Sequence, residues 1–150
     1  MAERFLGFDF GTKSLGIAVG STATGRAEPL TAAAVRHGLP DWAVVDRLVQ
    51  DWQPAALVVG LPLNMDDSEN AMTRAARKFG QRLHARYNLP VHWVDERLTS
   101  VEAKNAMVEA RVPWSRRKAK VDKLAAQTIL QAYLDEGRDP KREDRHARDG

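Results

Sequence analysis

The first third of the chain contains a mostly apolar segment, a segment that alternates apolar and small residues, and a segment of small residues, all of which are typical of β-strands. Three such segments cover residues 4–10, 15–20 and 29–36, and connections that contain glycine separate them. Strands joined by short turns pair antiparallel, so the sequence predicts an antiparallel meander. Gly11 lies in the first connection, where glycine permits a positive φ or the close approach of a ligand to the backbone.

The middle of the chain switches between helical and strand patterns. Apolar residues recur at helical spacing behind Asp41, a favourable N-cap, and Pro54 ends this first helix. A continuous apolar run over residues 55–61 predicts a strand that is buried on both faces, as in a parallel sheet. A second helical stripe over residues 72–87 leads to a short strand at 91–94.

The last third contains two predicted helices, a basic loop and a tail. The segment Thr99-Ser100-Val101-Glu102 fits a capping box and opens a helix that runs to about residue 109. A basic loop follows, and the last helix spans about residues 121–136, ended by Gly137. Residues 138–150 have almost no apolar side chain to bury. We therefore predict one domain at 1–137 and a disordered charged tail at 138–150.

The order of these elements predicts an α/β fold built on a mixed five-stranded sheet that helices flank. Strands that follow a crossover helix run parallel, and right-handed crossovers place them beside the first strand. The carboxyl ends of neighbouring parallel strands then meet at one edge of the sheet, where ligands usually bind in open α/β sheets. Asp9 and Glu96 both lie at such ends.

The composition narrows the partners and the compartment. The chain has no cysteine, which excludes disulfides and thiolate metal sites. It has no stretch of about 18 apolar residues, so we expect a cytoplasmic protein without a membrane span. The 23 Lys and Arg residues exceed the 20 Asp and Glu residues by only three, but bases concentrate between Arg111 and Lys123. That patch suits a phosphate-rich partner, and on charge alone a solvated loop explains it equally well.

Three acidic residues carry the candidate chemistry. Asp9 interrupts a strongly apolar strand, and Glu96 belongs to two adjacent acids, of which only one can face the Asp9 side. Asp122 lies at the edge of the apolar stripe of the last helix, in its first turn. Each has a plain structural explanation when taken alone: a turn cap, a local ion pair with Arg97, and a partner for the helix dipole, respectively.

Taken together, the three carboxylates suit Mg²⁺ or Mn²⁺, which prefer oxygen ligands and leave room for substrate phosphates. We therefore predict a metal-dependent endonuclease in which Asp9, Glu96 and Asp122 are both metal ligands and catalytic residues. Nearby cations would hold the phosphates of a nucleic acid; the candidates are Lys13, Arg97, Arg116, Arg117 and Lys118. Trp114, predicted in the basic loop, is the candidate for contact with a base or ribose.

Four blocks of the sequence, FDFGTKSLGIAVG, VVGLPLNMDDSE, VDERLTS and VDKLAAQTILQAYL, together resemble the YqgF family, also called RuvX, over about residues 4–136. The resemblance implies a ribonuclease H-like fold and a nuclease that resolves Holliday junctions or matures the 5′ end of pre-16S ribosomal RNA. It implies the same three acids, with Lys13 and Asn64 lining the edge of the site. Where the family block usually has glycine after aspartate, this chain has Asp67 after Asp66, so it stays open whether Asp66 or Asp95 joins the site.

Two other functions compete with a nuclease. The segment DFGTKS also looks like the first phosphate loop of the actin, sugar kinase and heat-shock ATPase superfamily, but that fold needs a second domain with further phosphate loops. A non-catalytic nucleic-acid-binding module would use the basic loop and give the acids no role. Among nucleases, we favour pre-rRNA processing over junction resolution on the resemblance alone. A resolvase should be a homodimer because junctions are two-fold symmetric, whereas an RNA-trimming enzyme can be a monomer.

Overall fold

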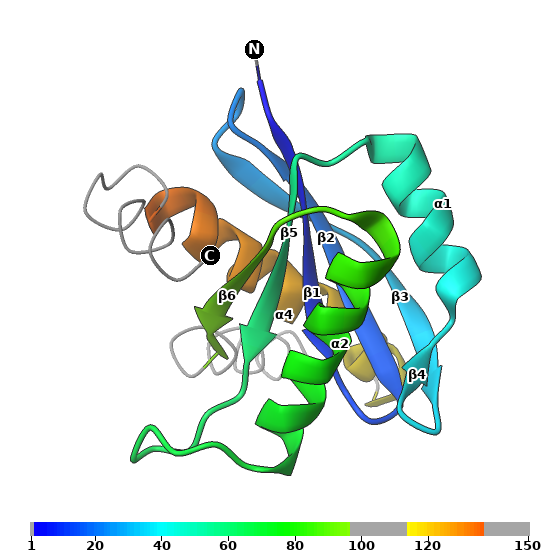
Figure 1. The fold of residues 1–150 in the computed structure, drawn as a ribbon, viewed down its shortest axis with the longest axis vertical. Coiled ribbons are helices and arrows are strands. Elements are labelled where there is room, and N and C mark those ends of the chain that lie inside the picture. The colour runs from blue at the N-terminus through cyan, green and yellow to red at the C-terminus, as the bar shows by residue number, and fades with distance from the viewer. Residues whose placement is uncertain (1, 97–113, 137–150) are drawn as a thin grey trace.

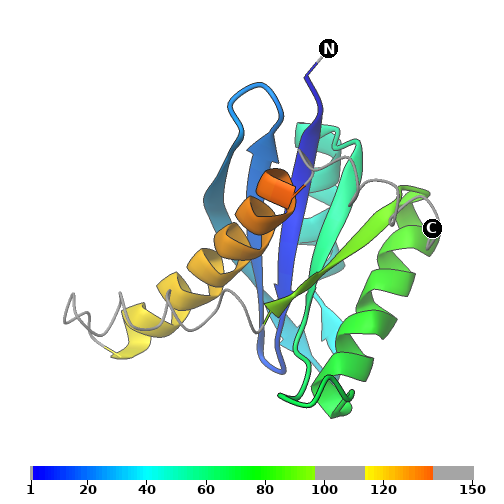
Figure 2. The same ribbon diagram turned by 90° about the vertical axis from the view of Figure 1, so that its left-hand side faces the viewer.

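The computed structural model describes residues 2–96 and 114–136, and for residues 114–122 it gives the helical backbone without side chains. A mixed sheet with the strand order β4-β3-β2-β1-β5-β6 forms the centre of the fold (Figure 1). Helices α1 and α2 cover one face of this sheet, and α4 crosses the other (Figure 2). The elements are β1 (Arg4–Phe10), β2 (Ser14–Ser21), β3 (Arg26–Arg36), β4 (Leu39–Pro40), α1 (Trp42–Trp52), β5 (Ala56–Leu61), α2 (Ala71–Tyr87), β6 (Val91–Asp95) and α4 (Trp114–Glu136).

The strand pairing confirms the predicted mixed α/β architecture. Strands β1, β2 and β3 form the antiparallel meander, while β5 pairs parallel with both β1 and β6. The predicted count of five strands was wrong, because the described residues already form six. The additional strand β4 is only two residues long and folds back on the end of β3, with Arg36 opposite Leu39. Two residues are too few to produce a period-2 pattern.

The helices on the first face begin and end as their flanking residues dictate. The carboxylate of Asp41 accepts a hydrogen bond from the backbone N–H of Ala43 at 3.2 Å and so caps α1, as predicted. Gln53 ends that helix in the left-handed conformation, one residue before Pro54. Helix α2 starts at a capping box formed by Asn70 and Thr73.

The sheet separates two hydrophobic cores. On the α1 and α2 side, Phe10 stacks on Phe79 with ring centroids 4.9 Å apart, and Trp42 covers Phe79 at 6.1 Å. On the other side, α4 packs Ile129, Leu130 and Leu134 onto a surface of small residues. Strand β1 contributes to both cores because its side chains alternate between them.

Three glycines on adjacent strands let α4 approach the sheet backbone. A Cβ on Gly7 would lie 2.7 Å from the Cβ of Leu130, and one on Gly60 would lie 2.5 Å from the Cδ1 of Ile129. A Cβ on Gly20 would lie 2.9 Å from the Cδ1 of Leu134. These separations are shorter than van der Waals contact, so any larger residue would push the helix outward.

Helix α4 begins at Trp114, seven residues before the predicted start near Val121. The prediction of a basic loop was therefore wrong for Trp114 and for Arg116, Arg117 and Lys118, whose backbone is helical. The physical reason is that Arg, Lys and Ala are strong helix formers even where no apolar stripe marks the helix.

Other predictions for the last third lie outside the described residues: the helix over 99–109, the stop at Gly137 and the tail at 138–150. Within the described ranges, no helix is long and apolar enough to cross a membrane.

Candidate active site

Asp9 lies near the end of β1 on the face that α4 covers. Phe5 packs edge-on against Tyr133 of α4 at 5.3 Å, and Gly7 lies under Leu130. Because successive side chains of a strand point to opposite faces, Asp9 follows Phe5 and Gly7 on the α4 side. Its side chain is half-buried. The structure thus places this carboxylate at the carboxyl end of a central strand.

Glu96 lies just past the end of β6 on the same face. His92 stacks on Tyr133 of α4 at 5.3 Å, and Val94 belongs to the α4-side core, so the alternation carries Glu96 to that side. A Cβ on Gly60 would lie 3.7 Å from the Cβ of Glu96, which agrees with this placement. Asp95 alternates to the opposite face, so Glu96 is the member of the acidic pair that shares a side with Asp9.

Strand β5 lies between the two acid-bearing strands, and its Gly60 carries no side chain. Phe8 pairs with Val59, so the next residue along, Gly60, stands beside Asp9, and Gly60 in turn pairs with Val94 of β6. The two acid-bearing strands are two strand spacings apart, roughly 10 Å. Side chains that converge across this gap can share one or two divalent ions.

Position 122 belongs to α4, but its side chain lies outside the described ones. Helix α4 packs on the sheet through Leu134, Leu130 and Ala126, which lie four residues apart. Leu134 contacts Gly20, which is paired with Phe5 near the start of β1, while Leu130 and Ala126 contact Gly7 in the middle of that strand. Position 122 is the next in this series, toward the end of β1 where Asp9 lies.

Lys13 is exposed in the turn between β1 and β2, at the same edge of the sheet. Its carbonyl accepts a hydrogen bond of 3.0 Å from the backbone N–H of Val35. Among the described residues its ammonium forms no ion pair.

Gly11 does not have a positive φ. A Cβ there would lie 2.9 Å from the carbonyl oxygen of Ser14, so the glycine permits the turn backbone itself to close.

Asn64 lies in the loop between β5 and α2, which also leaves this edge of the sheet. Its side-chain amide donates to the hydroxyl of Ser68 at 2.9 Å and its oxygen accepts from the amide of Asn70 at 2.8 Å. Asp66 accepts from both the backbone N–H and the hydroxyl of Ser68, at 3.1 and 2.5 Å. Both residues thus hold the loop in shape, and one oxygen of Asp66 is directed back into it.

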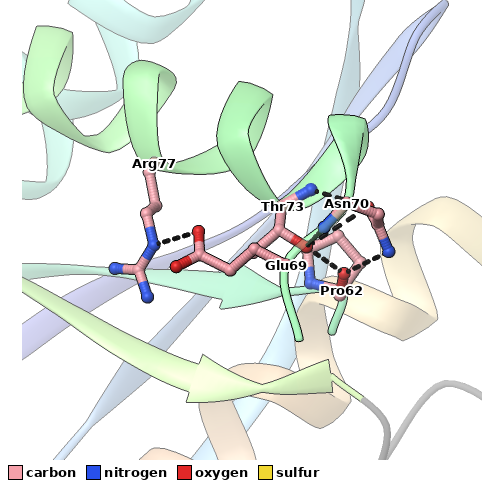
Figure 3. A network of polar contacts seen from close by, with 5 residues as sticks. All are labelled: Pro62, Glu69, Asn70, Thr73 and Arg77. Carbon is pink, nitrogen blue, oxygen red and sulfur yellow. Dashed lines mark hydrogen bonds and ion pairs between the residues drawn. The ribbon is translucent and has the colours of Figure 1, made fainter. Parts of the chain in front are cut away.

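A polar network anchors this loop to α2 (Figure 3). Thr73, fully buried, donates to the carbonyl of Pro62 at 2.5 Å, and the side chain of Asn70 donates to the same oxygen at 3.2 Å. Glu69 pairs with Arg77 at 2.7 Å. The sequence interpretation missed Asn70 and Thr73, although the spacing of an amide and a hydroxyl three residues apart before an apolar stripe is a capping signal that could have found them.

Four of the predicted phosphate-binding residues cannot be placed by their side chains. Arg97 lies outside the described residues, and Arg116, Arg117 and Lys118 are described by their helical backbone alone. Within the described side chains, no three His, Asp or Glu residues come close enough to hold one metal ion. The donors that do share the face, Asp9 and Glu96, are carboxylates, and these are the ligands that Mg²⁺ and Mn²⁺ prefer.

A clamp between α1 and α2, on the other side of the sheet, contains groups with strongly shifted pKa values. Hydrogen bonds from Arg86 and then from Tyr87 lower the pKa of Asp46 to about 2. Burial, followed by the hydrogen bond to Asp46, raises the pKa of Tyr87 above its usual value. Arg86 also lies over the ring of Trp42 at 4.9 Å. This cluster joins two helices and is remote from the candidate carboxylates.

Comparison with known proteins places these observations in a family. A family model described as "RuvX: Holliday junction resolvase" matches residues 3–136. A protein of Nitrosococcus oceani named "Putative pre-16S rRNA nuclease" is 50% identical over 131 residues, which are 87% of this chain and 86% of that protein. A protein of Salmonella typhi with the same name is 45% identical over 137 residues, 91% of this chain and 99% of its own length.

Two solved structures resemble the fold at low sequence identity. RuvC of T. thermophilus, in complex with a Holliday junction substrate, has a TM-score of 0.51 and 17% identity, covering 89% of this chain and 96% of that one. The yeast mitochondrial Holliday junction resolvase Ydc2 has a TM-score of 0.51 and 10% identity, covering 88% and 78%. These likenesses confirm the ribonuclease H-like fold.

Proposed function

The chain belongs to the RuvX family, and from this premise we propose that it is a metal-dependent endonuclease that processes the 5′ end of pre-16S ribosomal RNA. The observation that carries the proposal is the placement of Asp9 and Glu96 on one face of the sheet, at its carboxyl edge, with Gly60 between them. The names of relatives that are 45–50% identical over nearly the whole chain support the choice of RNA.

In this proposal Asp9 and Glu96 each contribute carboxylate oxygens to Mg²⁺ or Mn²⁺. Bound ions would supply an activated water and stabilise the leaving oxygen of the phosphodiester. The residues of the chain fix the geometry. Asp9 is held on the central strand, and Glu96 lies beyond Gly60, on which Ile129 of α4 packs.

Asp122 is the third proposed ligand and catalytic residue. The series Leu134, Leu130 and Ala126, which follows β1 toward its carboxyl end, supports this assignment because position 122 is one helical turn further along.

Substrate phosphates are proposed to contact Lys13, whose ammonium forms no ion pair in the described part of the chain. We extend the same role to Arg97, Arg116, Arg117 and Lys118. We also assign Asn64 to the edge of the site, because its side-chain hydrogen bonds hold the loop that leaves this edge. We further propose that residues 1–137 form the nuclease domain of a monomer that acts in the cytoplasm.

A second candidate function, the resolution of Holliday junctions, follows from the description of the matching family. It requires a homodimer, since a four-way junction is two-fold symmetric. The mass of the protein in solution, with and without junction DNA, separates this candidate from the first.

The direct test incubates the protein with Mn²⁺ and either a precursor rRNA fragment or a four-way DNA junction. We expect cleavage of the RNA, and a loss of at least about 100-fold in Asp9→Asn and Glu96→Gln, because even the partners of metal ligands cost 10- to 100-fold when removed. Glu28→Gln is the matched control, since Glu28 is an exposed carboxylate at the other end of the sheet. Cleavage of the junction alone would refute the RNA assignment, and full activity in Asp9→Asn would refute the mechanism.

A further inference from the structure

Met65 is the most exposed large apolar side chain in the described part of the chain. It is 90% exposed, and the next, Leu39, is 45% exposed. Met65 lies in the turn from Asn64 to Ser68, which forms the tip of the loop between β5 and α2. This loop extends from the edge of the sheet where β1 and β6 also end (Figure 1). An exposed apolar side chain therefore belongs to a loop that leaves the edge of the sheet where the candidate carboxylates lie.

The exposure of Met65 is built into the conformation of the loop. The backbone N–H of Asn64 donates to the carbonyl of Ser68 at 2.9 Å, and that of Asp67 donates to the carbonyl of Asn64 at 3.0 Å. Asp67 adopts the left-handed conformation, with φ of 70°, which closes the turn. Together with the side-chain bonds of Asn64 to Ser68 and Asn70, these contacts fix the chain on both sides of Met65.

The residues around Met65 bear on whether a base or a phosphate of a nucleic acid would contact its side chain. Asp66 and Asp67 follow it directly, so two acidic residues lie next to the thioether in the chain. The proposed cation of this edge, Lys13, lies in a different turn, between β1 and β2. A thioether on a rigid, acidic tip suits the uncharged face of a base, and proteins use methionine among the apolar side chains that wedge against bases.

We propose that Met65 packs against a base that has left its helical stack next to the scissile phosphodiester. The substrate class of the site is then nucleic acid with an unstacked base at the cleavage position, such as a single strand or a bulge, in preference to a continuous duplex. The inference rests on the proposed nuclease function and adds a requirement on substrate structure to it.

The experiment presents one labelled RNA sequence in three forms: as a single strand, in a perfect duplex, and in a duplex with one bulged base. The variants are Met65→Ala, Met65→Gln and Met65→Leu. Leu39→Ala is the matched control, because Leu39 is also an exposed large apolar residue among the described ones and lies on the hairpin of β3 and β4. Circular dichroism checks that each variant folds.

We expect the wild type to cleave the single strand and the bulge faster than the duplex. Met65→Ala should lower kcat/KM on the first two by about five- to tenfold, the effect of losing part of one apolar contact. Met65→Gln should behave like Met65→Ala, while Met65→Leu and Leu39→Ala should retain wild-type rates.

Binding provides a second readout that does not depend on cleavage. With 2-aminopurine as the bulged base and Asp9→Asn as the background, binding should change the fluorescence, and adding Met65→Ala should reduce that change. Equal rates for Met65→Ala and wild type on all three substrates would overturn the inference while leaving the nuclease intact. A wild type that cleaves none of them would instead count against the proposed function.

Discussion

Replacing Gly60 by alanine tests how closely α4 must lie on the sheet. A methyl group there would meet the Cδ1 of Ile129 at 2.5 Å and its Cγ1 at 3.1 Å. Ordinary carbon–carbon contact is about 3.5–4.0 Å, so Ile129 or the whole helix has to move by roughly 1 Å. Ile129 is completely buried, which leaves it no open space to turn into.

The expected cost follows from two opposing effects. Overpacking a filled core costs about 1–3 kcal/mol, whereas alanine is better than glycine in a strand by about 0.5–1 kcal/mol. We expect Gly60→Ala to lower the free energy of unfolding by roughly 0.5–2 kcal/mol. In the proposed nuclease it should also slow cleavage, because a displaced α4 moves position 122 away from Asp9.

A double-mutant cycle with Ile129→Val isolates the clash. Valine lacks the Cδ1 atom, and on its own this change should cost about 0.5–1.5 kcal/mol. In the Gly60→Ala background the same change relieves the contact, so the two effects should couple by about 1 kcal/mol or more. Urea unfolding followed by circular dichroism gives each free energy. If the two changes add within about 0.5 kcal/mol, α4 is not held at this height by Gly60, and the reasoning fails.

Three further predictions concern the polar contacts. Thr73→Val should lower the free energy of unfolding by about 1–3 kcal/mol, because it removes the hydroxyl bonded to the carbonyl of Pro62. It should also speed proteolysis within the loop, whereas Thr73→Ser should have neither effect. Asp41→Ala should cost about 1 kcal/mol in a thermal melt, as the loss of an N-cap does, and Asp41→Asn should not. Because the pKa of Asp46 is lowered to about 2 in the folded state, its contribution is present above the ordinary value of 3.8 and is lost as pH falls toward 2. Between pH 4 and pH 2 the wild type should therefore lose more stability than Asp46→Asn, and parallel acid curves for the two proteins would contradict the clamp with Arg86.

The architecture was predictable where a pattern repeats over several residues. The apolar segment of β1, the alternation in β2 and the unbroken apolar run in β5 identified a meander followed by parallel strands, and the pairing confirms both. Strand β4 was not predicted, because two residues are too few to show the period-2 alternation of a strand. The start of α4 was placed too late because its first residues are mainly basic, and backbone propensity, rather than an apolar stripe, keeps them helical.

The candidate site was predictable to the extent that strand geometry determines it. Asp9 and Glu96 follow strands whose alternation sends both to the α4 side, and the sequence contains that information. The bracing of the β5–α2 loop was not predictable, since the carbonyl of Pro62 meets Thr73 only after the chain turns into α2. The same holds for Asp66, whose bonds to Ser68 depend on the shape of that loop.

Strand β1 directs Phe8 and Phe10 to one side of the sheet and Asp9 to the other. The sheet therefore separates the aromatic core from the candidate site. An engineer can rebuild the aromatic packing around Phe79 to raise the melting temperature without touching the compartment that α4 encloses. In the proposed nuclease, substitutions around Phe79 should therefore change stability and leave the position of the carboxylates unchanged.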